Sequence, residues 1–235
     1  MPKIVLTPEL RKELLELYKG LRVADVRDGM DWNMMHHYGS MSHEIRPLFR
    51  TLAMGFARTA RYIKFTGPIP HMSPEEYSEW VGWYYENVCT YPWDKLIEDG
   101  DFLVLDCGGV DTGLIGSNNG LGIILRGARG LVTNGGIRDT DECVMQKLPF
   151  WSAMISQSMV QGRLQFDAMD IPVTVGGVQV NPGDIIVADG DGVIAVPLEM
   201  ARSVAKYARQ ENSGDRIGRG ILYEKAGWEK DGTVD

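Results

Sequence analysis

Apolar residues recur at helical intervals near the start of the chain. Between Pro8 and Tyr18, leucines alternate with charged residues at the spacing of a helix, and Lys19-Gly20 ends this pattern. A second helix is expected from about Val23. Residues 32–43 are rich in Met and His and include a glycine, which predicts a loop, and residues 45–64 have the character of an extended segment.

Residues 63–98 form an aromatic-rich insert. Ser73-Pro74-Glu75-Glu76 is typical of a helix start, with Ser at the N-cap, Pro in the first turn and two acids at the positive end of the helix dipole. Three of the six tryptophans follow between residues 80 and 93. These rings either pack in the core or at a subunit contact, or form, together with Trp32, the wall or lid of a pocket.

From Gly100 onward, short strands alternate with helices. The predicted elements are strands at 102–106, 130–133, 185–188 and 193–196, helices at 121–128 and from 138, a turn at 134–136, a hairpin at 173–180 and a C-terminal helix at 198–211. Strand–helix alternation followed by hairpins predicts an α/β fold with a mixed sheet.

Composition and charge argue against several classes of protein. The chain has 235 residues, 44% hydrophobic and 24% charged, and its net charge of −8 disfavours a nucleic-acid-binding surface. Its apolar runs are too short to span a bilayer, so we expect no membrane partner. Three cysteines without metal-type spacing, and an N-terminus (Met1–Lys3) without signal-peptide features, predict a reduced, cytoplasmic setting.

The most informative stretch runs from Gly108 to Asp139. Six glycines between residues 108 and 122 allow the backbone to turn and to point N–H groups at a carboxylate or a phosphate, although no nucleotide-binding spacing is present. Arg138-Asp139 follows a strand, at the sheet edge where α/β proteins bind ligands. There the carboxylate suits a hard divalent cation and the guanidinium suits a substrate oxygen. The same pair is equally compatible with a helix N-cap and a surface ion pair.

Three segments, 113–116, 126–139 and 182–193, resemble one family: the 4-hydroxy-4-methyl-2-oxoglutarate / 4-carboxy-4-hydroxy-2-oxoadipate aldolases and the related regulator of ribonuclease activity A (RraA). Asp25-Val26 with Asp28, and residues 45–48, are similar to its N-terminal motifs. The resemblance implies a single RraA-like domain over residues 1–235, with a swivelling α/β/β-type fold and a C-terminal helical tail from about 198. It also implies a homotrimer or homohexamer with sites between neighbouring subunits.

The chemistry implied by the resemblance is that of a metal-dependent lyase. Such enzymes cleave a 4-hydroxy-2-oxo acid to pyruvate and a second oxo acid, and also decarboxylate oxaloacetate. By this similarity, Asp139 would bind Mg²⁺ or Mn²⁺, and Arg138 would donate a hydrogen bond to the C2 oxygen of a small oxo-acid or related carbonyl substrate. The backbone amides of residues 116–119 (Gly116, Ser117, Asn118 and Asn119) would hold the substrate carboxylate. Glu211 of a neighbouring subunit would approach the metal, or it is a solvated residue of the C-terminal helix.

Two positions depart from the family pattern. Ser117 stands where the aldolases carry an Asp, with twenty residues between it and Arg138, and Asn134 also replaces an Asp. Serine is a poor general base, so Ser117 would transfer the substrate's proton less effectively than the aspartate of the aldolases. His37, His43 or His71 is an alternative base.

The resemblance therefore leaves three functions open. The chain is a carbon–carbon lyase, an enzyme of other enolate chemistry (a decarboxylase, hydratase or isomerase), or a non-catalytic binding module like the ribonuclease regulator. That regulator lacks the Asp of the Arg-Asp pair, so the presence of Asp139 favours an enzyme.

Overall fold

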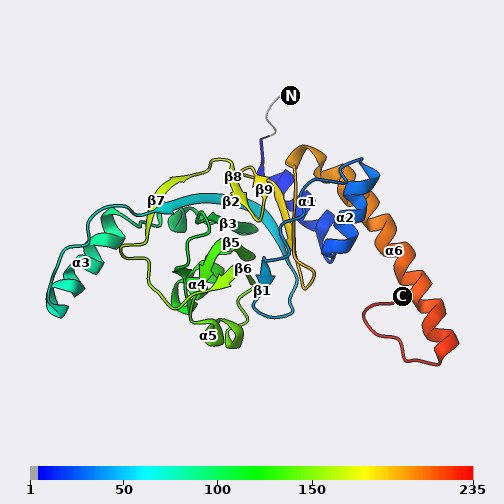
Figure 1. Ribbon diagram of the computed structural model, residues 1–235. Coiled ribbons are helices and arrows are strands. Elements are labelled where there is room, and N and C mark those ends of the chain that lie inside the picture. The colour runs from blue at the N-terminus through cyan, green and yellow to red at the C-terminus, as the bar shows by residue number, and fades with distance from the viewer. Residues whose placement is uncertain (1–4, 235) are drawn as a thin grey trace.

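The computed structural model describes residues 5–234, so the expectation about Met1–Lys3 lies outside the described residues. The helices are α1 (Pro8–Tyr18), α2 (Val23–Trp32), α3 (Pro74–Asn87), α4 (Ser117–Leu125), α5 (Thr140–Met145) and α6 (Ala201–Ala226), with 3₁₀ turns η1 (Pro92–Leu96) and η2 (Leu198–Met200) (Figure 1). No described helix is both long enough and apolar enough to cross a bilayer. Thr7 caps α1. Ser73 caps α3, as the sequence predicts, and forms a capping box with Glu76.

The strands form a mixed sheet, which confirms the predicted α/β class. They are β1 (Arg46–Pro47), β2 (Ala53–Lys64), β3 (Asp101–Asp106), β4 (Gly113–Ile115), β5 (Gly130–Ile137), β6 (Phe150–Ile155), β7 (Leu164–Met169), β8 (Val173–Val175), β9 (Val178–Val180), β10 (Ile185–Ala188) and β11 (Val193–Val196). The order across the main sheet is β1-β6-β5-β3-β2-β10-β11, with β4 beside β5 and β7 beside β2. Strands β2, β3, β5 and β6 are parallel, and the outer pairings with β1, β7, β10 and β11 are antiparallel.

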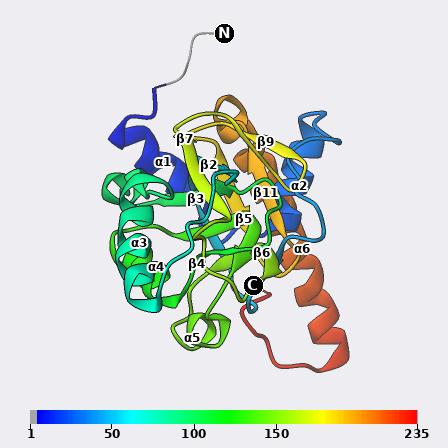
Figure 2. The same cartoon turned by 60° about the vertical axis from the view of Figure 1, so that its left-hand side comes forward.

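Helices pack on both sides of the sheet. In Figure 2, α3 and α4 lie on one side, and α2 and α6 lie on the other. Helix α2 packs tightly on α6 at Gly29, where a Cβ would lie 2.8 Å from the backbone nitrogen of Ala208. On the opposite side, Ile123 of α4 packs with Trp93 and with buried residues of β3 and β5. The β8–β9 hairpin, which the sequence predicts, covers a third cluster around Trp151.

The turn predicted at residues 134–136 is wrong, because β5 continues through them to Ile137. The glycines are needed for close packing and not for a change of direction. A Cβ at Gly135 would lie 2.7 Å from the Cβ of Cys107, and one at Gly136 would lie 2.6 Å from the Cβ of Ser156. The chain turns only after Arg138, at Asp139, whose backbone is left-handed (φ 53°).

Helix α4 begins at Ser117, four residues before the predicted start at 121. The glycines of this segment suggested a loop, but Gly120 lies inside the helix. A Cβ there would lie 2.6 Å from the ring of Phe150, so the small residue lets α4 pack directly on β6. The predicted boundaries 121–128 are therefore shifted toward the C-terminus.

The C-terminal helix is longer than predicted. Residues 198–200 form η2, and α6 runs from Ala201 to Ala226 and does not end near Glu211. Three glycines between 214 and 220 weaken the helical signal in the sequence. The final segment of the chain supports this half of the helix, since Arg216 donates to the carbonyls of Gly232 and Val234 at 2.8 Å.

The aromatic insert contributes mainly to the core. Tyr84 and Trp93 are fully buried, and the Trp93 indole donates to the Tyr62 hydroxyl at 2.8 Å. Trp32 lies away from these rings: it stacks on Tyr207 of α6 at 5.2 Å between ring centroids. The prediction that Trp32 joins the insert in one pocket wall is therefore wrong.

A buried carboxyl group lies at the start of β10. Asp184 is 4% exposed and accepts hydrogen bonds from the backbone N–H groups of Asn181 (2.8 Å) and Leu198 (3.2 Å). Burial raises the pKa of Asp184 to about 6 despite these bonds. The folded state thus holds this proton more tightly than the unfolded chain does.

We therefore expect Asp184 to lower stability as pH rises from about 4 to about 6, because ionisation is more costly in the folded state. In Asp184→Asn, the fall in unfolding free energy between pH 4 and pH 7 should shrink by about 1–3 kcal/mol relative to the native chain. Urea unfolding at several pH values measures this. Asp191→Asn, at an exposed position, is the control and should leave the pH profile unchanged.

Candidate active site

The Arg-Asp pair lies at one end of the parallel strands. Arg138 and Asp139 directly follow β5, and the backbone N–H of Arg138 donates to the carbonyl of Ile115 in β4 at 3.0 Å. Helix α4 begins two residues after that carbonyl, and α5 begins directly after Asp139. Figure 2 shows β4, β5, α4 and α5 close together at this end of the sheet.

Two glycines allow the Arg-Asp pair to contact the start of α4. A Cβ at Gly113 would lie 2.7 Å from Cγ of Arg138, so the arginine side chain lies directly against this backbone. A Cβ at Gly116 would overlap Oδ2 of Asp139. The carboxylate therefore lies beside the N-cap of α4, where the helix dipole favours a negative charge.

The polar groups of this site are largely unengaged. Nε of Arg138 donates to Oδ1 of Asp139 at 3.1 Å, and the two side chains are 32% and 36% exposed. Among the described residues, neither terminal nitrogen of Arg138 has a hydrogen-bond partner. The backbone N–H groups of residues 117–119 belong to the first turn of α4, which has no partner within a helix. The predicted residues 116–119, Arg138 and Asp139 are thus brought together.

Asn134 has a structural role that the sequence did not reveal. Its side-chain nitrogen donates to Oδ1 of Asp106 (2.8 Å) and to the carbonyl of Thr174 (3.1 Å). Its side-chain oxygen accepts from the N–H of Cys107 at 2.6 Å. The amide links the ends of β3 and β5 to the β8–β9 hairpin, and an aspartate could not donate either bond.

Asp139 is the carboxylate that this site offers to a metal ion. Within residues 5–234 no group of three His, Cys, Asp or Glu side chains converges as a metal site would require. A Mg²⁺-type ion is commonly held by one or two carboxylates, with waters and substrate oxygens completing its shell. Asp139 fits that arrangement, and the remaining ligands would come from water, substrate or another subunit.

The other predicted candidates lie away from the Arg-Asp pair in this chain. Glu211 of α6 accepts a hydrogen bond from the Trp32 indole at 2.7 Å, beside Asp28. His37 lines a hollow formed by residues 34–38, after α2. No described contact joins any of these residues to Arg138 or Asp139. Cys107 is buried, and burial raises its pKa to about 12, so its thiol stays protonated at neutral pH.

Part of the aromatic insert lines a cavity along α4. Tyr91, Trp93 and Asp94 face Asn118, Asn119 and Arg126 across about 320 Å³. The Tyr91 hydroxyl also donates to the carbonyl of Leu114 in β4 at 3.0 Å. The insert thus contributes both to the core and to the wall of a cavity. The sequence carried no signal for the Tyr91 contact, because it joins segments that are 23 positions apart.

Comparison with known proteins identifies the family. Residues 23–195 match the family model described as RraA-like (Aldolase/RraA), so the chain belongs to the RraA-like family. It is 32% identical over 111 residues to a 4-hydroxy-4-methyl-2-oxoglutarate aldolase of Thermus thermophilus, covering 44% of this chain and 65% of the relative. A Deinococcus radiodurans protein provisionally given the same name is 36% identical over 101 residues, covering 43% of this chain and 62% of the relative. Both alignments thus span less than two thirds of the relatives' lengths.

Solved structures support the same fold. An uncharacterized protein of Pseudomonas syringae pv. tomato has a TM-score of 0.71 and 23% identity, with 93% of this chain and 94% of that chain covered. RraAS2 of Streptomyces coelicolor, described as an unusual member of the RNase ES inhibitor RraA family, has a TM-score of 0.69 and 24% identity, with 88% and 96% covered. At these identities the similarity establishes the fold alone.

The hydrogen bonds of Asn134 lead to a stability prediction. In Asn134→Asp, a second carboxylate would face Asp106 and both donated bonds would be lost, which should cost about 1–3 kcal/mol at pH 7. The loss should shrink near pH 4, because one carboxyl group can take up a proton and donate. Chemical unfolding at both pH values measures this, with Gln210→Glu on the exposed face of α6 as the matched control. An equal loss at both values would show that charge repulsion is not the cause.

Proposed function

We propose that the protein is a divalent-metal-dependent carbon–carbon lyase that acts on a 2-oxo acid through an enolate. The observation that carries this proposal is the contact of Arg138 and Asp139 with the start of α4. This contact brings together a guanidinium whose two terminal nitrogens have no described partner, a carboxylate and the free N–H groups at the start of a helix. The aldolase names of relatives with 32–36% identity support the same class of reaction.

Each part of the site matches a part of a 2-oxo acid. The N–H groups of residues 117–119 would bind the C1 carboxylate, as helix N-termini bind anions. The terminal nitrogens of Arg138 would donate to the C2 oxygen. Asp139 would hold Mg²⁺ or Mn²⁺ beside that oxygen, and the cation would supply positive charge where the enolate develops.

Cleavage breaks the C3–C4 bond of the substrate. The electron pair of that bond passes into the C2–C3 enolate, and its negative charge rests on the oxygen that Arg138 contacts. Protonation at C3 then gives pyruvate. In an aldol cleavage the C4 hydroxyl group must also lose its proton, whereas in decarboxylation of oxaloacetate the C4 carboxylate leaves as CO₂ and needs no base.

Ser117 favours decarboxylation as the second candidate activity. Its hydroxyl group has no hydrogen-bond partner among the described residues, so no neighbouring base activates it. This chain thus supplies the groups that we propose to stabilise the enolate, while no described base is hydrogen-bonded to Ser117 to accept the proton of a C4 hydroxyl group. We expect oxaloacetate decarboxylation to exceed cleavage of 4-hydroxy-4-methyl-2-oxoglutarate.

Removal of the Asp139 charge should abolish metal-dependent turnover. In Asp139→Asn, we expect kcat/KM for oxaloacetate decarboxylation to fall about 100-fold or more, because the enolate loses its electrostatic stabilisation. Pyruvate release with Mg²⁺ or Mn²⁺, and again with EDTA, measures this. Asp141→Asn, two residues further on in α5, is the matched control and should retain activity. Metal-independent turnover that survives in Asp139→Asn would contradict the proposal.

Supplying a carboxylate at position 117 should restore aldol cleavage. In Ser117→Asp, we expect the ratio of aldol cleavage to decarboxylation to rise about tenfold or more, as a positioned general base commonly provides at least that factor. Asn118→Asp introduces the same charge one position along the helix and should not change the ratio. The two rates, followed by pyruvate release from each substrate, decide between a missing base and a base supplied from elsewhere.

A further inference from the structure

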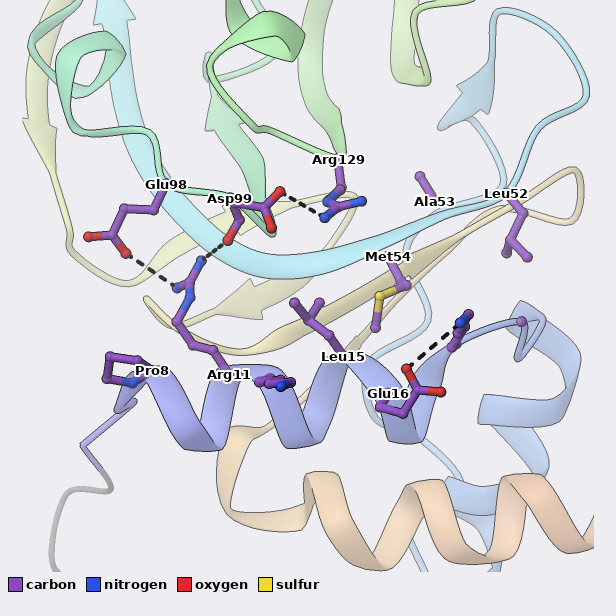
Figure 3. Close-up of a pocket in the computed structure, with 13 residues that line it drawn as sticks. Pro8, Arg11, Leu15, Glu16, Leu52, Ala53, Met54, Glu98, Asp99 and Arg129 are labelled. Carbon is purple, nitrogen blue, oxygen red and sulfur yellow. Dashed lines mark hydrogen bonds and ion pairs between the residues drawn. The ribbon is translucent and has the colours of Figure 1, made fainter.

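A second cavity opens at the opposite end of the parallel strands. It has a volume of about 990 Å³ and lies between α1 and the segments that precede β3 and β5 (Figure 3). Glu98 and Asp99 precede β3, and Arg129 precedes β5. Strand β5 has eight residues, so its two ends lie about 23 Å apart at about 3.3 Å per residue. This cavity is therefore separate from the Arg-Asp site, and the inference does not rest on the proposed function.

One wall of the cavity is held rigidly. Asp101 is 2% exposed and accepts hydrogen bonds from Arg11 at 2.8 Å and from Arg58 at 2.6 Å. Arg11 also donates to the carbonyl of Asp99 at 2.9 Å and lies 4.6 Å above the ring of Phe56. These contacts fix α1 against the sheet, so the cavity is preformed, as small-molecule sites usually are.

The middle of the cavity is apolar. Leu15 of α1 faces Met54 (Figure 3), and Leu52 and Ala53, which precede Met54 in the chain, complete the apolar part of the lining. Leu52 is 45% exposed. Leu52 and Met54 lie inside a concave surface of this size. Such a surface suits a flexible aliphatic group of a ligand.

The charges around the cavity leave one cation without a partner. The three acids that line it each pair with a base: Glu98 with Arg11 (3.8 Å), Asp99 with Arg129 (2.7 Å) and Glu16 with Lys19 (3.8 Å). Lys12 is the fourth basic residue of the lining, and within residues 5–234 its ammonium group makes no ion pair or hydrogen bond. Lys12 and Leu15 are three positions apart on α1 and so lie on the same helix face.

We propose that this cavity binds an aliphatic monocarboxylate of medium chain length. The carboxylate pairs with Lys12, and the chain lies over Leu15, Leu52 and Met54. The surplus of one positive charge matches a single carboxylate, and the apolar floor distinguishes a fatty acid from a short oxo acid. The ligand class is therefore different from the substrate class of the Arg-Asp site.

Calorimetric titration of the native protein with octanoate tests this. We expect one octanoate per chain, with acetate bound at least about tenfold more weakly because it lacks the six methylenes that the apolar floor covers. In Lys12→Gln, octanoate affinity should fall about fivefold, as the loss of a partly exposed ion pair would give. Lys225→Gln, an exposed lysine of α6, is the matched control. In Leu52→Ser, octanoate should also bind more weakly.

A second measurement places the ligand. In protein labelled with ¹³C at the methionine methyl groups, octanoate should shift the Met54 resonance, which is assigned by its loss in Met54→Leu. Three outcomes would each overturn the proposal. The first is failure of octanoate to bind at about 10 mM, the highest practical concentration for such a weak ligand. The others are equal octanoate affinity in Lys12→Gln and a Met54 signal that octanoate leaves unshifted. None of these readouts depends on turnover, so the failure of the proposed enzyme activity would not affect them.

Discussion

The candidate site depends on the close approach of the Arg-Asp pair to the backbone of β4 and the start of α4. That approach is possible only because Gly113 and Gly116 carry no side chain, since a Cβ at either position would collide with Arg138 or Asp139. The parallel pairing of Gly113 with Gly136 brings the two backbones together. The same physical requirement recurs at Gly120, where α4 meets Phe150. The main role of these glycines is therefore to let neighbouring side chains pack directly against the backbone, and backbone flexibility is secondary.

The aromatic insert supports β4 and α4, the strand and helix that carry the candidate site. The Tyr91 hydroxyl group bonds to the carbonyl of Leu114 in β4, and Trp93 packs in the same cluster as Ile123 of α4. Tyr62 of β2 connects the two, because its hydroxyl group accepts from Trp93 and donates to the carbonyl of Thr90 at 2.9 Å. Burial raises the pKa of the Tyr62 hydroxyl well above its usual value, so it remains a neutral donor at physiological pH. The insert thus fixes the strand and helix that form the site.

Local signals predicted the elements well, while signals between distant segments were missing. The cap at Ser73 and the periodicity of residues 8–18 identified α3 and α1, since both depend on neighbours within a few residues. The glycines at 120 and 135 suggested a loop and a turn, because their packing partners, Phe150 and Cys107, lie far away in the sequence. The grouping of site residues 116–119 with Arg138 and Asp139 came from the resemblance to a family. Spacing alone left an ordinary N-cap equally possible.

The two departures from the family pattern have different physical consequences. Asn134 donates from its side-chain nitrogen and accepts at its side-chain oxygen, and an aspartate there would repel Asp106. This change therefore affects the contacts that join β3 and β5. The Ser117 side chain makes no hydrogen bond with the described residues, so no polar contact of the framework requires a serine in place of an aspartate. A position that the fold leaves free can vary with the reaction. The proposed reaction therefore differs from an aldol cleavage in its proton transfer, while it uses the same stabilisation of an enolate.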